Sequence, residues 1–171
     1  MGEEEQHAAR VYHGRMPAQE FFRTFSSPIG WVAMRATEGH ITGIAFAEEE
    51  QEATPDAPAC LLYCEKQLRE YFEGARRSFD DLPLQMRATD FQRRVWEEAM
   101  EIPFGLTLSY GQLAVNIGDP DAARAVGGAL GRNALAIIVP CHRIVPAESE
   151  EAGGFAWGME RKKWLLAHEQ A

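Results

Sequence analysis

Two short helices with explicit end signals, between residues 109 and 130, are the feature that most restricts the fold of this chain. Residues 109–112 (Ser-Tyr-Gly-Gln) have the pattern of a capping box and open a helix that we expect to end near Gly118. Asp119 then fits an N-cap with a proline at the first helical position, and a second helix follows over residues 122–130. Helices joined by so short a turn are typical of a helix-turn-helix, although many such hairpins bind nothing.

The second of these helices has almost no side chains on its surface. Residues 122–130 are alanine, glycine, valine and leucine except for Arg124. Small residues let a backbone come very close to another body, which is here either a packed helix or a bound ligand. Gly127 and Gly128 fit both interpretations, whereas Arg124 is difficult to explain as packing.

The first half of the chain predicts a polar tail and a small antiparallel sheet. Residues 1–20 contain the acidic run Glu3-Glu4-Glu5, which is typical of a solvated tail. Three β-rich runs separated by turn sequences then indicate a meander over residues 21–25, 31–36 and 40–46. An amphipathic helix follows and is expected to stop at Gly74. Its apolar stripe consists of Leu61, Cys64, Leu68, Tyr71 and Phe72.

The pattern after this helix divides the chain into two parts. Residues 76–87 are charged and aperiodic, which indicates a linker, and residues 89–92 form a second capping box that opens a helix to about Glu101. We therefore expect an α+β protein. A tail over 1–20 and a small N-terminal antiparallel sheet and helix domain over 21–86 would precede a mostly helical, winged-helix-like C-terminal domain over 87–171.

Composition excludes several classes of protein. A chain with 46% hydrophobic and 25% charged residues is typical of ordinary globular proteins rather than disordered or fibrous ones. No apolar run approaches the ~20 residues that cross a membrane. The acidic start does not resemble a signal peptide, so we expect a cytoplasmic protein with no membrane partner. Three cysteines cannot all pair, and each is core filler, metal ligand or nucleophile.

The formal net charge of −9 argues at first against a nucleic-acid partner. The charge is unevenly distributed, however: residues 1–85 hold 8 Lys and Arg against 15 Asp and Glu. Between residues 103 and 146 the balance reverses, because Arg124, Arg132 and Arg143 face only Asp119 and Asp121. If the protein contacts DNA, we expect this segment to make the contact.

A cysteine next to a histidine carries the clearest chemical signal. Residues 136–139 have the pattern of a short buried strand that leads into Pro140-Cys141-His142-Arg143. A thiol is nucleophilic only as the thiolate, so a reactive cysteine needs a base or a positive neighbour, and both are adjacent. Neighbouring side chains usually diverge, which favours a relay through one water over a direct bond. Cys60 and Cys64 have no histidine nearby, and we expect no metal site.

The segment around Cys141 is accompanied by other motifs in a fixed order. These are Ser27-Pro28-Ile29-Gly30, Glu70-Tyr71-Phe72, Ser109-Tyr110-Gly111-Gln112-Leu113-Ala114, Ala122-Ala123-Arg124-Ala125-Val126-Gly127-Gly128-Ala129, Asn133, Gly154-Phe155-Ala156-Trp157-Gly158, Arg161-Lys162 and Leu165-Leu166-Ala167-His168-Glu169. Together with Pro140-Cys141-His142-Arg143 they resemble the O6-methylguanine-DNA methyltransferases in order and spacing. Only about the first twenty residues lie outside this resemblance.

The resemblance implies direct-reversal DNA repair. The alkyl group of O6-alkylguanine in duplex DNA would move irreversibly to Cys141 after the base has flipped out of the stack, and the protein would inactivate itself. O4-alkylthymine stays open as a further substrate. The partner is then double-stranded DNA, the protein acts as a monomer, and no cofactor or metal is required.

The same resemblance implies roles for individual residues. Cys141 is the nucleophile, His142 takes its proton through water, and Glu169 orients and charges the imidazole. Tyr110 donates a hydrogen bond to a ring nitrogen of the flipped base and helps to displace the target phosphate. Arg124 takes the place that the base has left, while the small residues of its helix enter the minor groove. Further DNA contacts are expected at Gly111, Asp119, Ala123 and Asn133, and the substrate pocket is expected at Val139, Ile144, Phe155, Ala156 and Trp157.

Structural interpretations of these residues stay open beside the functional ones. Tyr110 fits a half-buried aromatic at a helix start, Asn133 fits a helix stop, and Glu169 fits a frayed terminal residue. Two other functions are also compatible with the motifs. One is a non-catalytic alkylguanine-flipping protein, whose members carry Trp in place of the cysteine, and the other is a thiol hydrolase with an oxyanion hole.

Overall fold

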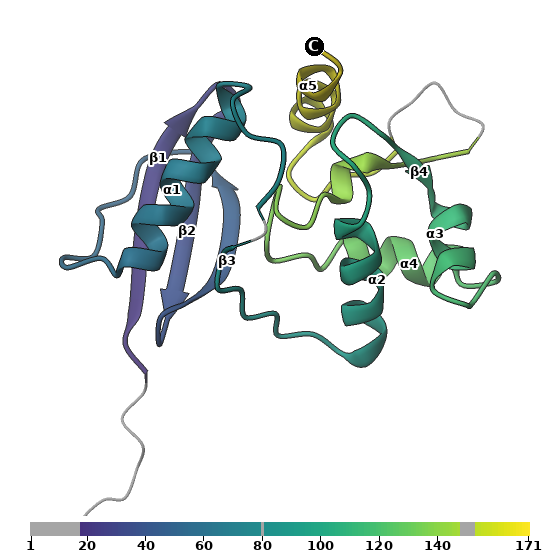
Figure 1. The fold of residues 1–171 in the computed structure, drawn as a ribbon, viewed down its shortest axis with the longest axis horizontal. Helices are drawn as coiled ribbons and strands as arrows, with labels where there is room; N and C mark the ends of the chain where they lie inside the picture. The colour runs from purple at the N-terminus through teal and green to yellow at the C-terminus, as the bar shows by residue number, and fades with distance from the viewer. Residues whose placement is uncertain (1–17, 80, 148–152) are drawn as a thin grey trace, which may run out of the picture.

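The computed structural model describes residues 18–79, 81–147 and 153–171. The acidic run Glu3-Glu4-Glu5 and nearly all of the expected tail lie outside the described residues. The described chain forms two parts that lie side by side, a small sheet with one helix and a cluster of helices (Figure 1). None of the helices in this part of the chain is long and apolar enough to cross a membrane.

Three antiparallel strands in the order β1-β2-β3 form the expected meander. They are β1 (Glu20–Ser27), β2 (Gly30–Thr37) and β3 (His40–Ala47). Alternation along β2 separates the two faces of the sheet, because Val32 and Met34 are buried and Arg35 is exposed. The buried face packs against α1 (Ala59–Phe72), which lies in front of β1 and β2 in Figure 1. No helix of the described residues covers the opposite face.

The apolar stripe predicted for α1 is confirmed. Its buried residues include Leu61, Cys64, Leu68 and Tyr71, and Gly74 ends the helix with a positive φ of 76°. The linker that follows is tied to the sheet, because the amide of Ile41 donates to the carbonyl of Pro83 over 2.7 Å.

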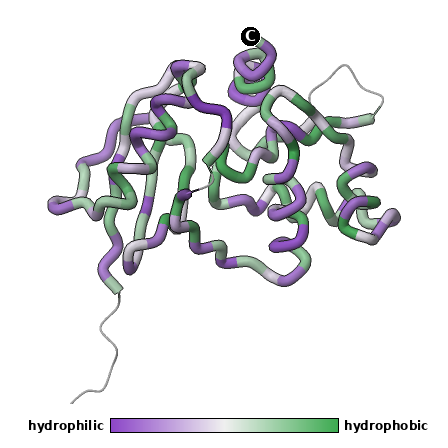
Figure 2. Tube along the Cα trace, viewed as in Figure 1, coloured by the Kyte–Doolittle hydropathy of each residue, from purple (hydrophilic) through white to green (hydrophobic). Residues whose placement is uncertain are grey.

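Helices α2 (Asp90–Met100) and α3 (Tyr110–Asn116) both begin with the predicted capping boxes. Thr89 and Gln92 exchange hydrogen bonds at the first, and Ser109 and Gln112 do so at the second. Helix α4 (Ala123–Leu130) packs against both α2 and α3. The indole of Trp96 fixes this packing with a hydrogen bond of 2.9 Å to the carbonyl of Ala129. Figure 2 shows hydrophobic and hydrophilic segments alternating along the chain in both halves.

Two local predictions are wrong. Asp119 is not the N-cap of α4, because its carbonyl accepts a bond from the amide of Ala122 and closes a turn, and Ala122 is the N-cap. Residues 136–139 are buried but do not form a strand. Ile137 has a φ of 71°, and the bridge between Ala136 and Val139 closes a tight turn.

This turn connects the two parts of the molecule. The amide of Ile44 in β3 donates to the carbonyl of Ala134, and the amide of Ala136 donates back to the carbonyl of Ile44. Helix α5 (Met159–Gln170) then lies over the junction (Figure 1). On α5, His168 stacks on Trp164 and bonds the carbonyl of Tyr71 on α1, so both residues pack at the junction. The core is therefore continuous from the sheet to the helices.

Candidate active site

Cys141 lies at the base of a small pocket beside α4. It is the first residue of the 3-10 helix η1 (Cys141–Arg143), which leads into β5 (Ile144–Val145). Strand β5 pairs in parallel with β4 (Leu108–Ser109) directly before α3, so the sheet register brings the cysteine beside the start of α3. The pocket has a volume of about 210 Å³. Its lining consists of Tyr110, Gly127, Leu130, Gly131, Cys141, Gly154, Phe155 and Ala156.

The thiol of Cys141 is 7% exposed and its environment acts on its ionisation in two directions. Burial raises the pKa of the Cys141 thiol, because a buried thiolate loses its hydration. A hydrogen bond of 3.3 Å from Nδ2 of Asn133 to Sγ and the positive charge of Lys162 both lower the pKa. The site therefore keeps the thiol protonated until a base removes the proton, and it then stabilises the thiolate that forms.

His142 is completely buried, and its two ring nitrogens have different surroundings. Nε2 lies 2.7 Å from Oε1 of Glu169, whereas Nδ1 has no hydrogen-bond partner among the described residues. Burial lowers the pKa of His142, which keeps the imidazole neutral, although Glu169 opposes this effect. If Glu169 is ionised, Nε2 carries the proton and Nδ1 offers a free lone pair.

The carboxylate of Glu169 accepts hydrogen bonds from five groups and is 5% exposed. Oε1 is bonded by His142 Nε2, Tyr71 OH and Arg143 Nη2, and Oε2 is bonded by Arg143 Nε and the amide of Gly105. Burial alone would raise the pKa of Glu169, but the hydrogen bonds from His142 and Arg143 outweigh it, so the pKa lies well below its usual range. Glu169 is therefore ionised and ordered rather than frayed.

Two residues of this network were not identified from the sequence. Lys162 on α5 is completely buried, and its Nζ donates to the carbonyl of Ile144 over 2.6 Å and to that of Gly154 over 3.2 Å. Burial lowers the pKa of Lys162 to about 8, while the nearby Cys141 raises it. Tyr71 lies on α1 in the N-terminal half and reaches Glu169 over 98 residues of sequence. In the sequence, Lys162 is one charged residue of a helix and Tyr71 is one member of an apolar stripe. Neither pattern predicts a contact with the site.

Arg143 binds Glu169, although its position in the sequence makes it a positive neighbour of Cys141. Its guanidinium binds both oxygens of Glu169, and its Nη1 donates to the carbonyl of Ile102 over 2.6 Å. Arg143 therefore compensates the buried carboxylate and holds η1 against the end of α2.

Tyr110 lines the pocket and packs against α4. A Cβ on Gly127 would lie 3.7 Å from the Tyr110 ring, which is an ordinary van der Waals contact, so this packing does not itself require a glycine. A Cβ on Gly128 would meet nothing within 4 Å, so Gly128 faces open space. Burial raises the pKa of Tyr110, which keeps the hydroxyl protonated as a hydrogen-bond donor.

The side of α4 away from the core is bare and carries one long side chain. Arg124 and Gly128 are exposed, as is Asp119 in the preceding turn, while Ala123 and Gly111 are partly buried. Arg124 forms no ion pair with any residue that the structure describes. This surface fits close approach of another molecule better than it fits packing within the chain.

The residues predicted for the substrate pocket separate into three groups. Phe155 and Ala156 line the pocket with Cys141. Val139 and Ile144 lie buried behind it, where their carbonyls accept hydrogen bonds from Asn133 and Lys162. Trp157 is not part of the pocket lining and contacts Phe46 edge to face at 6.2 Å.

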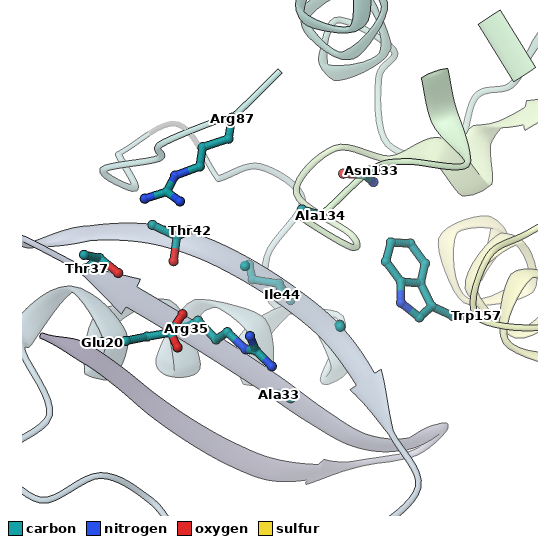
Figure 3. Close-up of a pocket in the computed structure, with 12 residues that line it drawn as sticks. Glu20, Ala33, Arg35, Thr37, Thr42, Ile44, Arg87, Asn133, Ala134 and Trp157 are labelled. Atoms are coloured by element: carbon teal, nitrogen blue, oxygen red, sulfur yellow. The ribbon is translucent and has the colours of Figure 1, made fainter. Parts of the chain in front are cut away.

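Trp157 instead forms the wall of a second pocket of about 410 Å³ (Figure 3). This pocket lies between the helix-free face of the sheet and the turn at Asn133 and Ala134. Arg35 and Arg87 line it, and Cys141 does not. It is therefore separate from the site built around the cysteine.

No group of three or more His, Cys, Asp or Glu side chains within residues 18–79, 81–147 and 153–171 could hold a metal ion. Cys64 is buried in the core, and burial raises its pKa to about 12, so it is inert as a nucleophile. Cys60 is partly buried, and burial also raises its pKa. Of the three thiols, Cys141 alone lines a pocket beside a histidine base.

Both halves of the chain are similar to known proteins. Residues 21–86 match the family model described as 6-O-methylguanine DNA methyltransferase, ribonuclease-like domain. Residues 90–171 match the model described as 6-O-methylguanine DNA methyltransferase, DNA binding domain. A protein of Mycobacterium bovis named methylated-DNA–protein-cysteine methyltransferase is 43% identical over 155 residues, which cover 88% of this chain and 92% of that protein.

Solved structures agree with these matches. The crystal structure of the Mycobacterium tuberculosis O6-methylguanine methyltransferase has a TM-score of 0.79 and 42% identity, covering 89% of this chain and 93% of that one. A crystal structure of the M. tuberculosis protein in complex with DNA has a TM-score of 0.78 and 41% identity, with coverage of 87% and 92%. The α+β fold predicted from the sequence is therefore confirmed, and the chain belongs to the 6-O-methylguanine DNA methyltransferase family.

Proposed function

We propose that this protein repairs O6-alkylguanine in duplex DNA by transferring the alkyl group to the Sγ of Cys141, in a single irreversible turnover. The observation that carries the proposal is the position of Cys141, at the base of a pocket and adjacent in sequence to a buried His142–Glu169 pair. The names of relatives with 43% identity support the same reaction. A cysteine at this position also argues against a non-catalytic alkylguanine-binding protein.

The residues of the site account for each atom of the reaction. The thiol proton of Cys141 passes through a water molecule to Nδ1 of His142, whose Nε2 proton is held by Glu169. The thiolate attacks the alkyl carbon, so an S–C bond forms as the bond between that carbon and guanine O6 breaks. The electron pair of the broken bond stays on the guanine, which takes up one proton from water, and His142 returns the proton that it accepted to water. Guanine and a thioether are the products, and no oxidant or cofactor is consumed.

The thioether has no evident route back to the thiol. Among the described residues that line the pocket, no second cysteine accompanies Cys141, and Cys60 and Cys64 lie on α1. One protein molecule would therefore repair one lesion.

The target base must leave the helix to reach this pocket, because its O6 is paired and stacked inside the duplex. We propose that α4 enters the minor groove and that Arg124 fills the space left by the flipped guanine. Tyr110, which lines the pocket, donates its hydroxyl hydrogen to a ring nitrogen of the guanine. Gly111, Asp119 and Ala123 are proposed to support this contact with DNA, and the buried Asn133 to brace the turn behind α4. The complex of the M. tuberculosis relative with DNA supports DNA as the partner.

We further propose that the protein acts as a monomer in the compartment that holds the DNA, which in a bacterial cell is the cytoplasm. We also propose two domains. Residues 21–86 form one domain, and residues 87–171 form the domain that binds DNA and accepts the alkyl group. The two family models, whose matches adjoin at residues 86 and 90, support this division.

Intact-protein mass spectrometry tests the reaction directly. After incubation with a duplex that contains O6-methylguanine, we expect one added methyl group per protein, on the peptide that contains Cys141. Cys141→Ser should show no adduct, and Cys60→Ser should show the same adduct as the wild type. The absence of a one-to-one adduct, or an adduct on Cys60 or Cys64, would overturn the proposal.

A further inference from the structure

A tyrosine hydroxyl and the imidazole of His142 bond the same oxygen atom of Glu169, which also accepts a hydrogen bond of 3.0 Å from Nη2 of Arg143. The hydroxyl of Tyr71 and Nε2 of His142 both lie 2.7 Å from Oε1 of Glu169. We propose that Tyr71 is a positioning residue for alkyl transfer: its hydrogen bond draws charge from this oxygen and thereby keeps His142 a neutral proton acceptor. The inference rests on the proposed function and adds a residue of the N-terminal half to its machinery.

Charged and titratable groups face the imidazole of His142 from α5 and from η1. Glu169 and Lys162 face it from α5, and Arg143 and Cys141 are its neighbours in η1. Glu169 favours the imidazolium form, whereas Arg143 and Lys162 oppose it. Tyr71 on α1 and the imidazole are linked through the oxygen of Glu169 that both residues bond.

A carboxylate oxygen stabilises a neighbouring imidazolium in proportion to the negative charge that other donors leave on it. Tyr71 is a reliable second donor, because burial and the charge of Glu169 raise its pKa and keep the hydroxyl protonated. Without this hydroxyl, Oε1 would attract the imidazolium more strongly. His142 would then hold a proton at pH values where the wild-type residue is a free base.

The position of Tyr71 is fixed by contacts other than its bond to Glu169. Removal of its hydroxyl therefore tests the effect on the charge of Oε1 and not the packing of the ring. Its ring is completely buried and contacts Phe72, Phe79 and Phe104. Its carbonyl also accepts a bond from His168 over 2.7 Å. The change Tyr71→Phe keeps the ring contacts and leaves Glu169 with four donors, so the buried carboxylate stays compensated.

Tyr63 provides a matched control on the same helix. Its hydroxyl also donates to a carboxylate, Oδ2 of Asp81 at 2.8 Å, but the residue is 39% exposed and lies outside the catalytic network. Tyr63→Phe therefore removes the same kind of hydrogen bond with no path to His142.

The decisive measurement is the rate of alkyl transfer from free O6-benzylguanine as a function of pH, because this substrate does not require DNA binding. For Tyr71→Phe we expect a rate about threefold below the wild type on the acidic limb and an equal rate on the alkaline plateau, since only the base protonation changes. Tyr63→Phe should follow the wild-type profile. A loss that is uniform across pH, or an unchanged profile, would overturn the inference.

A titration of His142 that does not depend on the reaction separates this inference from the proposed function. Carbon-13 NMR of labelled histidine follows the titration of His142 without any reaction, and its midpoint should move upward in Tyr71→Phe and stay fixed in Tyr63→Phe. An unmoved midpoint contradicts the role of Tyr71 even if Tyr71→Phe is less stable. If the wild type itself transfers no benzyl group to Cys141, the proposed function fails, and the NMR titration still decides the inference on its own.

Discussion

The side-chain amide of Asn133 donates a hydrogen bond to the Sγ of Cys141 over 3.3 Å, and both residues are buried. The same Nδ2 donates to the carbonyl of Val139 over 2.9 Å, and Oδ1 accepts from the amide of Leu135 over 2.8 Å. One side chain thus closes the turn that joins α4 to the cysteine and stabilises the thiolate. This arrangement explains why an asparagine, with a donor and an acceptor, occupies the position.

We predict that Asn133→Ala slows alkyl transfer about tenfold, because a hydrogen bond to a charged atom contributes about 1.5–3 kcal/mol. The unpaired groups of the turn should also lower the free energy of unfolding by about 1–3 kcal/mol. Single-turnover kinetics with O6-benzylguanine and urea denaturation measure the two effects. The control is Asn116→Ala, whose exposed amide bonds Glu98 and should affect neither. A wild-type rate in Asn133→Ala would remove Asn133 from the site.

We predict that Glu169→Gln abolishes efficient transfer and destabilises the protein by about 3–5 kcal/mol, because it leaves Arg143 buried without its opposite charge. The pH dependence follows from the lowered pKa of Glu169. Its contribution to stability is fully present above the pKa of the unfolded state, about 4.3, and is lost as the pH falls toward the folded pKa. Chemical denaturation at a series of pH values should therefore show a smaller acid-dependent loss in Glu169→Gln than in the wild type.

Glu160→Gln is the control for this variant, since Glu160 is an exposed carboxylate on the same helix. It should unfold like the wild type at every pH and react at the same rate. An acid transition that is identical in Glu169→Gln and the wild type would show that this carboxylate is not the group that titrates.

The features of the fold that depend on neighbouring residues could be predicted from the sequence. The capping boxes at Thr89 and Ser109 are complete within four residues, and both are present as predicted. The three-stranded meander follows from alternation and turn residues in the same way. Asp119 also resembled an N-cap from its local sequence. The amide of Ala122 donates a hydrogen bond to the carbonyl of Asp119 and closes a turn, so the helix begins later, at Ala123.

The features that depend on contacts between distant segments could not be predicted. Residues 136–139 have the composition of a strand, yet pairing with β3 on one side bends them into a turn at Ile137. Cys141 and His142 are recognisable because the chemistry requires adjacent residues. Tyr71 and Lys162 join them only through tertiary packing, which one sequence does not encode in any short pattern.

We predict that Lys162→Met slows transfer at neutral pH, because the positive charge of Lys162 lowers the pKa of the Cys141 thiol. The deficit should shrink as the pH rises, since hydroxide then supplies the thiolate that the variant lacks at pH 7. The control is the adjacent and exposed Lys163→Met, which should follow the wild-type profile. A deficit that is constant with pH would point to lost packing alone.

The buried amine has a second consequence that concerns stability. The folded pKa of Lys162 is about 8, below the value of about 10.4 in an unfolded chain. Between these values the unfolded chain binds more protons, so the contribution of Lys162 to stability rises with pH. Relative to Lys162→Met, the wild type should therefore become more stable between pH 8 and pH 10, as measured by urea denaturation.

We predict that Arg124→Ala reduces repair of an O6-methylguanine duplex by at least about tenfold and leaves transfer from O6-benzylguanine unchanged. Arg124 is exposed on α4 and lies outside the pocket lining, so its removal should affect base flipping and not the chemical step. The salt dependence of DNA binding should also decrease, because the variant brings one positive charge fewer to the DNA. Arg35→Ala, an exposed arginine on the sheet, is the control. Equal losses with both substrates would contradict the insertion role.

Gln67 is a buried residue of α1 that the proposed reaction does not use, and it tests the packing of the N-terminal half. Its side chain is completely buried, and neither the oxygen nor the nitrogen of its amide has a hydrogen-bond partner among the described residues. Burial of an amide without partners costs about 1–3 kcal/mol. Methionine has a similar length and no polar group to desolvate, so we predict that Gln67→Met raises the free energy of unfolding by about 1 kcal/mol.

Thermal and urea denaturation of Gln67→Met measure this gain, with Gln85→Met as the control because the Gln85 side chain is exposed. The rate of alkyl transfer should stay at the wild-type value in both variants, since neither residue contacts the Cys141 pocket. A loss of stability in Gln67→Met would mean that the amide is satisfied in solution, by water or by movement of α1. In that case α1 would pack less tightly on the sheet than its buried stripe indicates, and Tyr71 on the same helix would be held less rigidly against Glu169.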